Sequence, residues 1–280
     1  MEKIELLVFL TLKGIGSASG IVSYNDSLFI ISDNSSYLYE YNVREDNLNK
    51  IALIENPSEN TPKKEKLDLE AITLKEKQLH LFGSGSTEKR NKTISYHFEN
   101  KKVEQKDISS LYQNIKTKLH ISSEELNIEG ALFQGKDLLL FQRGNGAASK
   151  NGIIKIVNFN YKSNINDNLE FIPLQLPKVK NVEFTFTDAI LVKDKIYFLA
   201  AAEDTNSTYN DGEVLGSIIG IIDSKSFKVE KTIPISDKHK FEGLTLYKSS
   251  KKEMEFLLCE DNDTEDLNAT IYKLKLNINH

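Results

Sequence analysis

The sequence predicts an all-β fold, and specifically a five-bladed β-propeller that forms a single domain over residues 1–280. Short runs rich in apolar and β-branched residues recur between turn residues, which favours a sandwich, a barrel or a propeller. A dipeptide of Ser, Asp or Glu followed by Gly or Ala also recurs, with gaps of 51, 59, 59 and 54 residues, and of 57 across the termini. Such a period is typical of four-stranded blades. The five dipeptides are Ser19-Gly20, Glu70-Ala71, Glu129-Gly130, Asp188-Ala189 and Glu242-Gly243.

Each dipeptide begins a predicted innermost strand, and a strongly apolar strand follows it after a turn. An irregular β-sandwich with five chance similarities is the alternative, but it does not explain why the gap across the termini falls within the range of the others. A single short helical pattern lies at 107–119, where apolar residues recur four apart. The apolar strands are "SLFIIS" (27–32), "LHLFG" (79–83), "DLLLFQ" (137–142), "KIYFLA" (195–200) and "EFLLCE" (255–260).

The N-terminal segment "IELLVFLTL" (4–12) is predicted to close the ring by pairing with strands of the C-terminal blade. Closure removes a sheet edge that would otherwise invite aggregation. A signal peptide is the alternative, but it requires a basic n-region, and here Glu2 and Glu5 flank a single Lys3. We therefore expect a strand of the last blade in this segment.

The composition excludes several classes of function. The net charge is -5, from 36 basic and 41 acidic residues, whereas nucleic-acid binders normally carry a basic face. No apolar run approaches the roughly 20 residues that a membrane span needs. The single cysteine, Cys259, allows no intramolecular disulfide, and we expect a cytoplasmic monomer that binds neither nucleic acid nor membrane.

The repeated acidic residue predicts a metal site on the propeller axis. Equivalent positions of five innermost strands meet around one channel, and unpaired buried charges there would cost several kcal/mol each. All candidate ligands are oxygens, which favours Ca²⁺ over zinc. The alternative is a water-filled channel in which some acids are protonated or bond backbone amides. The predicted metal ligands are Ser19, Glu70, Glu129, Asp188 and Glu242.

A second set of polar residues is predicted to surround one mouth of this channel. In the first three blades it comes fourteen residues after the dipeptide, at Asp33, Ser84 and Arg143. Polar loops follow the second strands, and sites are often built on such loops. A simpler role for the acids is to cap turns. The acids predicted to serve as catalytic bases are Asp33, Glu203 and Asp204.

The loop "GSGSTEKR" (83–90) is a candidate anion site, because its glycines allow backbone amides to converge and its hydroxyls and cations surround them. An arginine in the next blade would hold a phosphate or carboxylate in bidentate fashion. The alternative is a hairpin loop with solvated charges. The predicted substrate-binding residues are Ser84, Ser86, Arg90, Arg143, Asn145 and Asp261.

The ring of Ser and acidic residues resembles that of the calcium-activated nucleotidases (apyrases), in which Ser and Glu alternate around a central Ca²⁺. It departs in the fourth blade, where Asp188 or its neighbour Thr187 stands in place of Ser. Nearly the whole chain is similar to a family of uncharacterised bacterial propellers related in pattern to phytase-like and esterase-like propellers. The strings that carry this similarity include "KKEKLDLEAIT", "FGSGSTEKR", "LNIEGALF", "LLLFQRGNG" and "AAEDTNSTYNDGEVLGSIIG".

These patterns lead to the hypothesis of a Ca²⁺-dependent hydrolase that acts on a phosphorylated or other anionic small substrate at the channel mouth. A non-enzymatic binding or scaffold propeller with a structural ion is the alternative, because a propeller fold decides no function by itself. A glycoside hydrolase is a third hypothesis, but the chain has no Trp to stack against a sugar.

Overall fold

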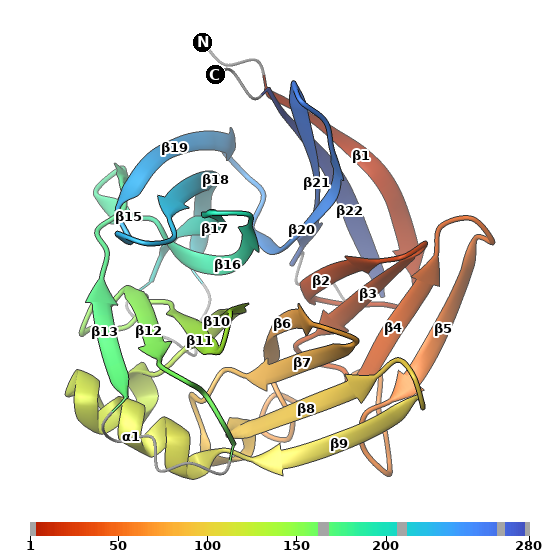
Figure 1. Ribbon diagram of the computed structural model, residues 1–280, viewed down its shortest axis with the longest axis horizontal. Helices are drawn as coiled ribbons and strands as arrows, with labels where there is room; N and C mark the ends of the chain where they lie inside the picture. The colour runs from red at the N-terminus through yellow and green to blue at the C-terminus, as the bar shows by residue number, and fades with distance from the viewer. Residues whose placement is uncertain (1–3, 162–167, 206–211, 262–266, 278–280) are drawn as a thin grey trace.

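The computed structural model describes residues 4–161, 168–205, 212–261 and 267–277, and it forms the predicted five-bladed propeller (Figure 1). Five antiparallel four-stranded sheets stand around a central channel, which confirms the fold class. The first three blades are β2 (Ala18–Tyr24), β3 (Ser27–Ser32), β4 (Tyr37–Asn42) and β5 (Asn47–Ala52); β6 (Leu69–Lys75), β7 (Gln78–Gly83), β8 (Lys92–His97) and β9 (Lys102–Asp107); and β10 (Ile128–Gln134), β11 (Asp137–Gln142), β12 (Gly152–Ile156) and β13 (Leu169–Pro173).

The remaining elements complete the ring. The last blade is closed by β1, which pairs antiparallel with β22, so the predicted closure by the N-terminal segment is confirmed. The fourth and fifth blades are β16 (Thr185–Val192), β17 (Lys195–Asp204), β18 (Glu213–Asp223) and β19 (Val229–Ser236); and β20 (Phe241–Ser249), β21 (Glu253–Glu260), β22 (Asn268–Asn277) and β1 (Ile4–Lys13). The other elements are η1 (Glu88–Arg90), α1 (Ser109–Leu119), η2 (Ser123–Glu125), β14 (Lys178–Val179) and β15 (Val182–Glu183).

In the described part of the chain, five apolar clusters fill the space between neighbouring blades. Each blade is covered on both faces, and the second strands are therefore apolar throughout rather than alternating. In β3, for example, every residue is buried. The helix α1 begins two residues later than predicted and buries Leu111, Tyr112, Ile115 and Leu119 against the second and third blades.

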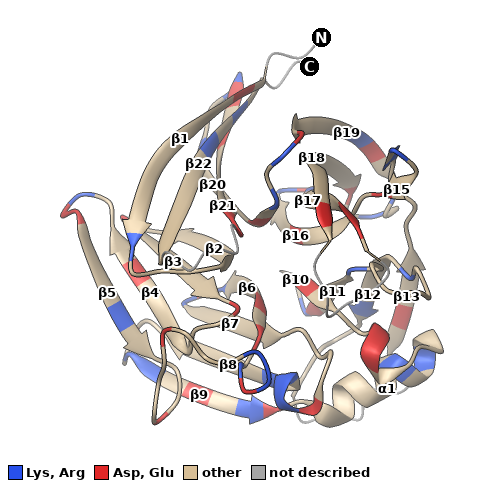
Figure 2. Ribbon diagram, turned by 180° about the vertical axis from the view of Figure 1, so that it is seen from behind, with Lys and Arg blue, Asp and Glu red and all other residues tan. Residues whose placement is uncertain are grey.

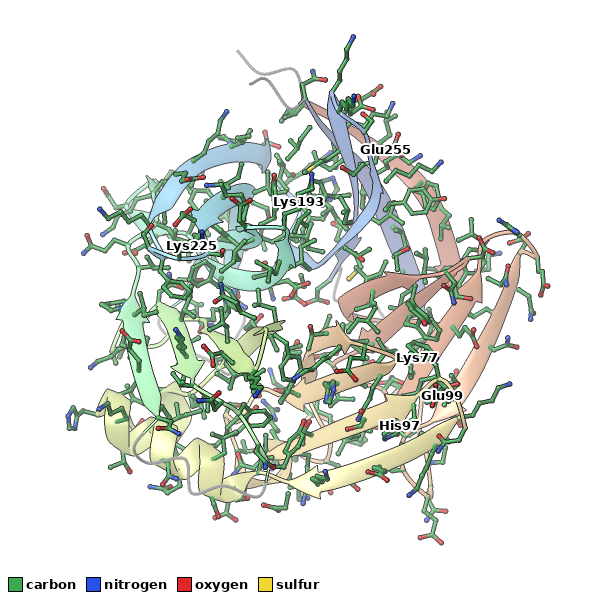
Figure 3. All side chains as sticks on the ribbon, viewed as in Figure 1. Lys77, His97, Glu99, Lys193, Lys225 and Glu255 are labelled. Atoms are coloured by element: carbon green, nitrogen blue, oxygen red, sulfur yellow. The ribbon has the colours of Figure 1, made fainter. Side chains whose placement is uncertain are left out.

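The outer surface is charged and carries exposed ion pairs. Figure 2 shows Lys and Arg alternating with Asp and Glu on the outer strand β9. Lys77 and Glu99, both labelled in Figure 3, form one such pair, with 2.8 Å between Nζ and Oε1. Exposed pairs of this kind contribute at most about 1 kcal/mol, so they favour solubility more than stability. No described helix has the length and apolarity needed to cross a bilayer.

A β-bulge interrupts the innermost strand of every blade at the recurrent motif. The pairing register shifts at Ser19, Glu70, Glu129 and Glu242, each of which lies immediately before its Gly or Ala. In the fourth blade the shift falls at Thr187 instead of Asp188. A bulge turns the side chain of the extra residue out of the regular alternation. The bulges therefore define the equivalent ring position, and in the fourth blade that position belongs to Thr187.

Candidate functional site

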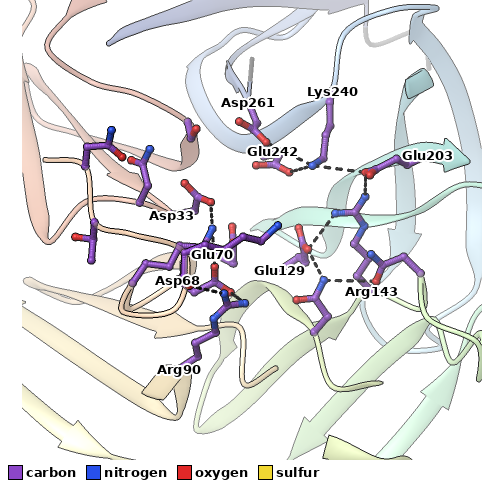
Figure 4. A pocket seen from close by; sticks show the side chains of 18 of the residues that line it. Asp33, Asp68, Glu70, Arg90, Glu129, Arg143, Glu203, Lys240, Glu242 and Asp261 are labelled. Carbon is purple, nitrogen blue, oxygen red and sulfur yellow. Dashed lines mark hydrogen bonds and ion pairs between the residues drawn. The ribbon is translucent and has the colours of Figure 1, made fainter. Parts of the chain in front are cut away.

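A polar cavity of about 360 Å³ opens at one mouth of the channel (Figure 4). Carboxylates outnumber cationic side chains in its lining by seven to five, and its other lining residues are mostly small polar ones. The cavity is therefore an acidic, water-accessible site at the place where the sequence predicted one. The acids are Asp33, Asp68, Glu70, Glu129, Glu203, Glu242 and Asp261, and the cations are Lys63, Lys66, Arg90, Arg143 and Lys240.

Of the five predicted metal ligands, Glu70, Glu129 and Glu242 line the cavity. Ser19 does not, because its hydroxyl donates a 2.5 Å hydrogen bond to the carbonyl of Leu69 in the next blade. The hydroxyl of Thr187 makes the equivalent 2.6 Å bond to Phe241. The hydroxyl positions of the ring thus tie one blade to the next, and the glutamates provide the polar face of the channel.

The prediction that Asp188 belongs to the ring is corrected by its contacts. Its carboxylate accepts 2.7 Å hydrogen bonds from the backbone N–H groups of Ala189 and of Leu244 in the fifth blade. It is buried away from the cavity, and burial raises its pKa well above the ordinary value even though these N–H groups lower it. Because the bulge falls one residue earlier, Asp188 points into the blade interface and links the two blades.

One charged cluster is centred on Asp68, which the sequence analysis did not select. Its carboxylate contacts Lys66 at 3.0 Å and Arg90 at 2.7 Å, and accepts a 2.5 Å hydrogen bond from the Ser84 hydroxyl. Arg90 also donates to the hydroxyl of Ser86 at 2.7 Å. The predicted anion loop is therefore turned inward, and its arginine is neutralised by Asp68 rather than presented to a ligand.

A second charged cluster joins the third, fourth and fifth blades. Arg143 contacts Glu129 at 3.1 Å and Glu203 at 2.6 Å, so the predicted anion clamp is also occupied by carboxylates. Lys240, which the sequence analysis did not select, contacts Glu242 at 2.9 Å and approaches Glu203 and Asp261 at about 3.5 Å. The cluster spans the channel and holds the three blades together electrostatically.

The repeat itself identifies Asp68 and Lys240, two cavity residues that the sequence analysis did not select. Asp68 and Lys240 each lie two positions before a bulge residue, at the same point of the repeat. The equivalent residues Ser17 and Asn127 also line the cavity, and Asn127 donates to Glu129 at 2.7 Å. These residues lie immediately before the innermost strands, and their side chains line the cavity next to the ring residues.

Glu70 has no counter-ion in direct contact. Within the described residues its carboxylate makes no hydrogen bond or ion pair. Burial raises its pKa well above the ordinary value, and the charges of Asp68, Glu129 and Glu242 raise it further. Burial and Lys240 act in opposite directions on Glu242, whose pKa is also raised. Glu70 is thus the carboxylate whose charge is least compensated in the site.

Asp33 lies beside Glu70 and is only partly neutralised. One oxygen contacts Lys66, whereas Oδ1 is buried and accepts no hydrogen bond. Burial raises the pKa of Asp33 to about 6, against the opposing effect of Lys66. Oxygen atoms of Asp33, Asp68 and Glu70 lie within 4.8 Å of one another, a spacing that would accommodate one metal ion.

The remaining predicted site residues lie at the edge of the cavity. Burial raises the pKa of Glu203, but Arg143 and Lys240 lower it more, so this acid is ionised and a weak base. Asp204 lines an adjoining hollow of about 240 Å³, which shares Asn145 and Glu203 with the main cavity. Asp261 lines the main cavity, as predicted from the strand ends. Parts of the predicted mouth loops, 206–211 and 262–266, lie outside the described residues.

Comparison with known proteins gives a family but no activity. No curated protein matches the chain. The fold is similar to the crystal structure of the RRP9 WD40 repeats, with a TM-score of 0.39 and 8% identity over 92% of this chain and 67% of that one. It is also similar to a putative exported protein from Bacteroides fragilis NCTC 9343, with a TM-score of 0.44 and 10% identity over 98% and 95%.

These similarities lend no support to the predicted relationship with apyrases or phytase-like propellers. The family match covers residues 14–276, and thus four blades and all of the fifth except β1 and the last residue of β22. It also includes every residue named in the cavity. This chain belongs to the DUF6929 family, which is described as a family of unknown function.

Proposed function

We propose that the cavity binds a divalent cation, Ca²⁺, with Glu70 and Asp33 as ligands and Asp68 beside them. The observation that carries this proposal is the uncompensated carboxylate of Glu70 among four other acids. Leaving such a charge buried is costly, and a cation or a proton must offset it. The seven acids and five cations of the lining favour the cation.

The chemistry of the donors selects the ion. The acids supply oxygen atoms only, and Ca²⁺ accepts six to eight such ligands in a flexible geometry that includes waters. The Mg²⁺ ion requires a tighter octahedron, and zinc prefers nitrogen and sulfur. Lys66 already neutralises part of Asp33 and Asp68. The ion would therefore be held mainly by the carboxylate of Glu70 and by the Asp33 oxygen that accepts no hydrogen bond.

The ion would give the site its means of holding an anionic substrate. Lys66, Arg90, Arg143 and Lys240 are each paired with carboxylates, so none of them offers an unpaired charge. A bound Ca²⁺ would polarise a phosphoryl or carbonyl oxygen or a water. We therefore propose a metal-dependent hydrolase of phosphorylated or other anionic small molecules.

Calorimetric titration of EDTA-treated protein with Ca²⁺ tests the ion. We expect saturable binding and a rise in the melting temperature, because a ligand that binds only the folded state stabilises it. Glu70→Gln should weaken binding by at least tenfold. Glu45→Gln, in an exposed turn of the first blade, is the matched control and should bind as the native chain does. Titration without heat or thermal shift would contradict the proposal.

A non-enzymatic binding propeller is the second candidate. It is favoured by the pairing of Lys66, Arg90, Arg143 and Lys240 with carboxylates, because these four cations have little to offer an anion without the metal. A screen of phosphomonoesters, phosphodiesters and nucleotides with and without Ca²⁺ separates the two. Turnover that requires Ca²⁺ and is lost in Glu70→Gln supports the hydrolase. Tight Ca²⁺ binding without turnover supports the binding propeller.

A further inference from the structure

A second hollow adjoins the acidic cavity and gives the site two lobes. Its volume is about 240 Å³, and it meets the cavity of about 360 Å³ at Asn145 and Glu203, which line both. Glu203 forms a fixed wall there, because Arg143 and the backbone N–H of Gly212 bond its two oxygens. Together the two lobes have the size of a small-molecule site, so one ligand can extend from the cavity into the hollow.

One wall of the hollow is a hairpin that the ring itself does not require. Among the described strands, β14 and β15 form the pair that belongs to no blade, and they lie between the third and fourth blades (Figure 1). Val182 packs this hairpin on the core of the fourth blade and lines the hollow. Asn181, at the tip, also lines it and has a φ of 70°, which Asn tolerates. Binding residues are often built on such additions to a rigid scaffold.

The end of β17 places an acid in the hollow. The pairing register of this strand shifts between Ala202 and Glu203. Glu203 lines both lobes, whereas Asp204, which the sequence analysis proposed as a base, lines only the hollow. Within the described residues, the carboxylate of Asp204 makes no hydrogen bond or ion pair. Its oxygens can therefore accept hydrogen bonds from a ligand in the hollow.

The lining of the two lobes selects a hydrophilic ligand without a flat apolar face. Among the described residues, the apolar side chains of the lining are Pro62 and Val182, and no aromatic ring lines either lobe. A nucleobase or a sugar ring would therefore lack an aromatic surface on which to stack. A second anionic group is not favoured in the hollow either, because Lys178, the one cation of its described lining, lies 4.0 Å from Glu183.

The hollow offers the hydrogen-bonding groups that alcohol hydroxyls need, since a hydroxyl both donates and accepts. Asp204 supplies acceptors, the amide of Asn181 supplies a donor and an acceptor, and the hydroxyl of Ser149 can do either. All three side chains are exposed, and none makes a hydrogen bond within the described part of the chain. Asn151 and Thr185, by contrast, are bonded within the protein.

We propose that the site binds the monophosphate of an open-chain polyol, with its hydroxylated chain in the hollow and its phosphoryl group in the cavity. This inference rests on the proposed function, because the Ca²⁺ proposed there is what holds the phosphoryl group. Asp204, Asn181 and Ser149 bond the hydroxyls of the chain. The choice of substrate is thus made in the hollow, whereas the ion lies in the cavity.

The test uses the full chain loaded with Ca²⁺ and two ligands that cannot be hydrolysed. One is the methylene phosphonate analogue of sorbitol 6-phosphate, and the other is phenylphosphonate, which carries a phosphonate group on an aromatic body. Calorimetric titration measures the dissociation constants, and NMR shifts of the backbone amides locate the ligand. We expect the polyol phosphonate to bind about tenfold more tightly, as one hydrogen bond to a charged group allows. It should also shift the amides of Ser149, Asn181 and Asp204 saturably.

Two variants remove single groups of the hollow. Asp204→Ala removes the carboxylate, and Asn181→Gly removes the amide while suiting the positive φ of the turn. Each should weaken binding of the polyol phosphonate by about tenfold and leave phenylphosphonate binding unchanged. The controls are Asp194→Ala, on the turn at the other end of β17, and Lys180→Gly, in the same turn as Asn181 but outside the lining. Both should bind as the native chain does.

Titration of the same protein with Ca²⁺ tests the proposed function separately. If Ca²⁺ binds but the polyol phosphonate binds no better than phenylphosphonate, or equally well to Asp204→Ala and Asn181→Gly, only the present inference is overturned. If Ca²⁺ does not bind, the proposed function is overturned. A titration with sorbitol, which carries no phosphoryl group, then tests the hollow alone. Saturable shifts of the Ser149, Asn181 and Asp204 amides would support the polyol site, and their absence would overturn it.

Discussion

Single residues at two points of the repeat decide the chemistry of the channel. The bulge residue supplies Glu70, Glu129 and Glu242, and the residue two positions earlier supplies Asp68 and Lys240. Both positions line the cavity, so acids and bases from different blades meet there. Side chains that a blade could not neutralise alone are neutralised by the neighbouring blades.

Arg143 is expected to be a structural residue as much as a binding one. Arg143→Met leaves Glu129 and Glu203 buried without their shared partner, and we expect a loss of about 3–5 kcal/mol in the free energy of unfolding. Urea denaturation measures this loss. Arg44→Met, at an exposed ion pair of the first blade, is the control and should change stability by less than about 0.5 kcal/mol. A loss below about 1 kcal/mol for Arg143→Met would contradict the role of this cluster.

His80 should make stability depend on pH. It is buried between the second and third blades, and burial, with a smaller effect of Lys75, lowers its pKa from 6.5 to about 4. Between these values the unfolded chain binds more protons than the folded one. The contribution of His80 to the free energy of unfolding is therefore fully present above pH 6.5, and it is lost as the pH falls toward 4.

At pH 5 this contribution should be about 2 kcal/mol smaller than at pH 7.5. Comparing urea denaturation of the native chain and of His80→Gln at both pH values isolates it from other titrations, such as that of Asp33. The native chain should lose about 2 kcal/mol more than the variant between the two pH values. Parallel losses in both proteins would show that His80 is not held neutral by burial.

At the scale of elements, the bulges in the five innermost strands position the site. Each bulge sets its residue toward the axis, and in four of the blades the Gly or Ala after it allows the strands to approach one another. The hydroxyls of Ser19 and Thr187 then bond the carbonyl that precedes the glutamate of the following blade. The same local geometry thus both joins the blades and orients the glutamates.

Gly243→Ala should be costly, because a Cβ atom there would crowd both the thiol of Cys259 and the backbone of the first blade. A Cβ atom at Gly243 would lie 2.9 Å from both Gly20 Cα and Ile21 N, which are backbone atoms and cannot turn aside. We expect a loss of about 1–3 kcal/mol, measured by thermal or urea unfolding. At Gly16 the closest contact would be the flexible end of Leu267 at 3.0 Å. Gly16→Ala is therefore the control, and equal losses would show that backbone crowding is not the cause.

At the scale of the whole molecule, stability depends on closing the ring. The strand β1 covers the edge of β22, and Leu12 packs in the cluster between the fifth and first blades. Removing β1 would leave a ten-residue edge strand unpaired, and such edges promote association between chains. Closure is therefore expected to control both stability and solubility.

A chain that begins at Gly14 tests this expectation. We expect it to lose cooperative thermal unfolding and to form aggregates in size-exclusion chromatography. A synthetic peptide of residues 1–13 should restore part of the stability, because it can pair with β22 in the same register. A truncated chain that stays monomeric and melts at the native temperature would show that the other blades suffice.

The sequence by itself determined the fold class, the number of blades and the closing strand, and it identified three acids that line one cavity. These follow from local patterns: apolar runs mark strands covered on both faces, and a motif that repeats at blade length marks one point on the axis. The three glutamates were found in this way because the innermost strands make their positions equivalent. Asp68 and Lys240 lie within reach of the same reasoning, through the register two residues earlier.

Only the tertiary structure decided which charged side chains are paired with one another. The bulge at Thr187 turned Asp188 into the blade interface, and no repeat count distinguishes a residue from its neighbour at a bulge. The sequence does not show whether Arg90 and Arg143 face a ligand or a carboxylate of the protein itself. Their partners come from distant segments, and their pairing depends on distances of a few ångströms. Those distances also left Glu70 without a counter-ion in direct contact in the acidic cavity.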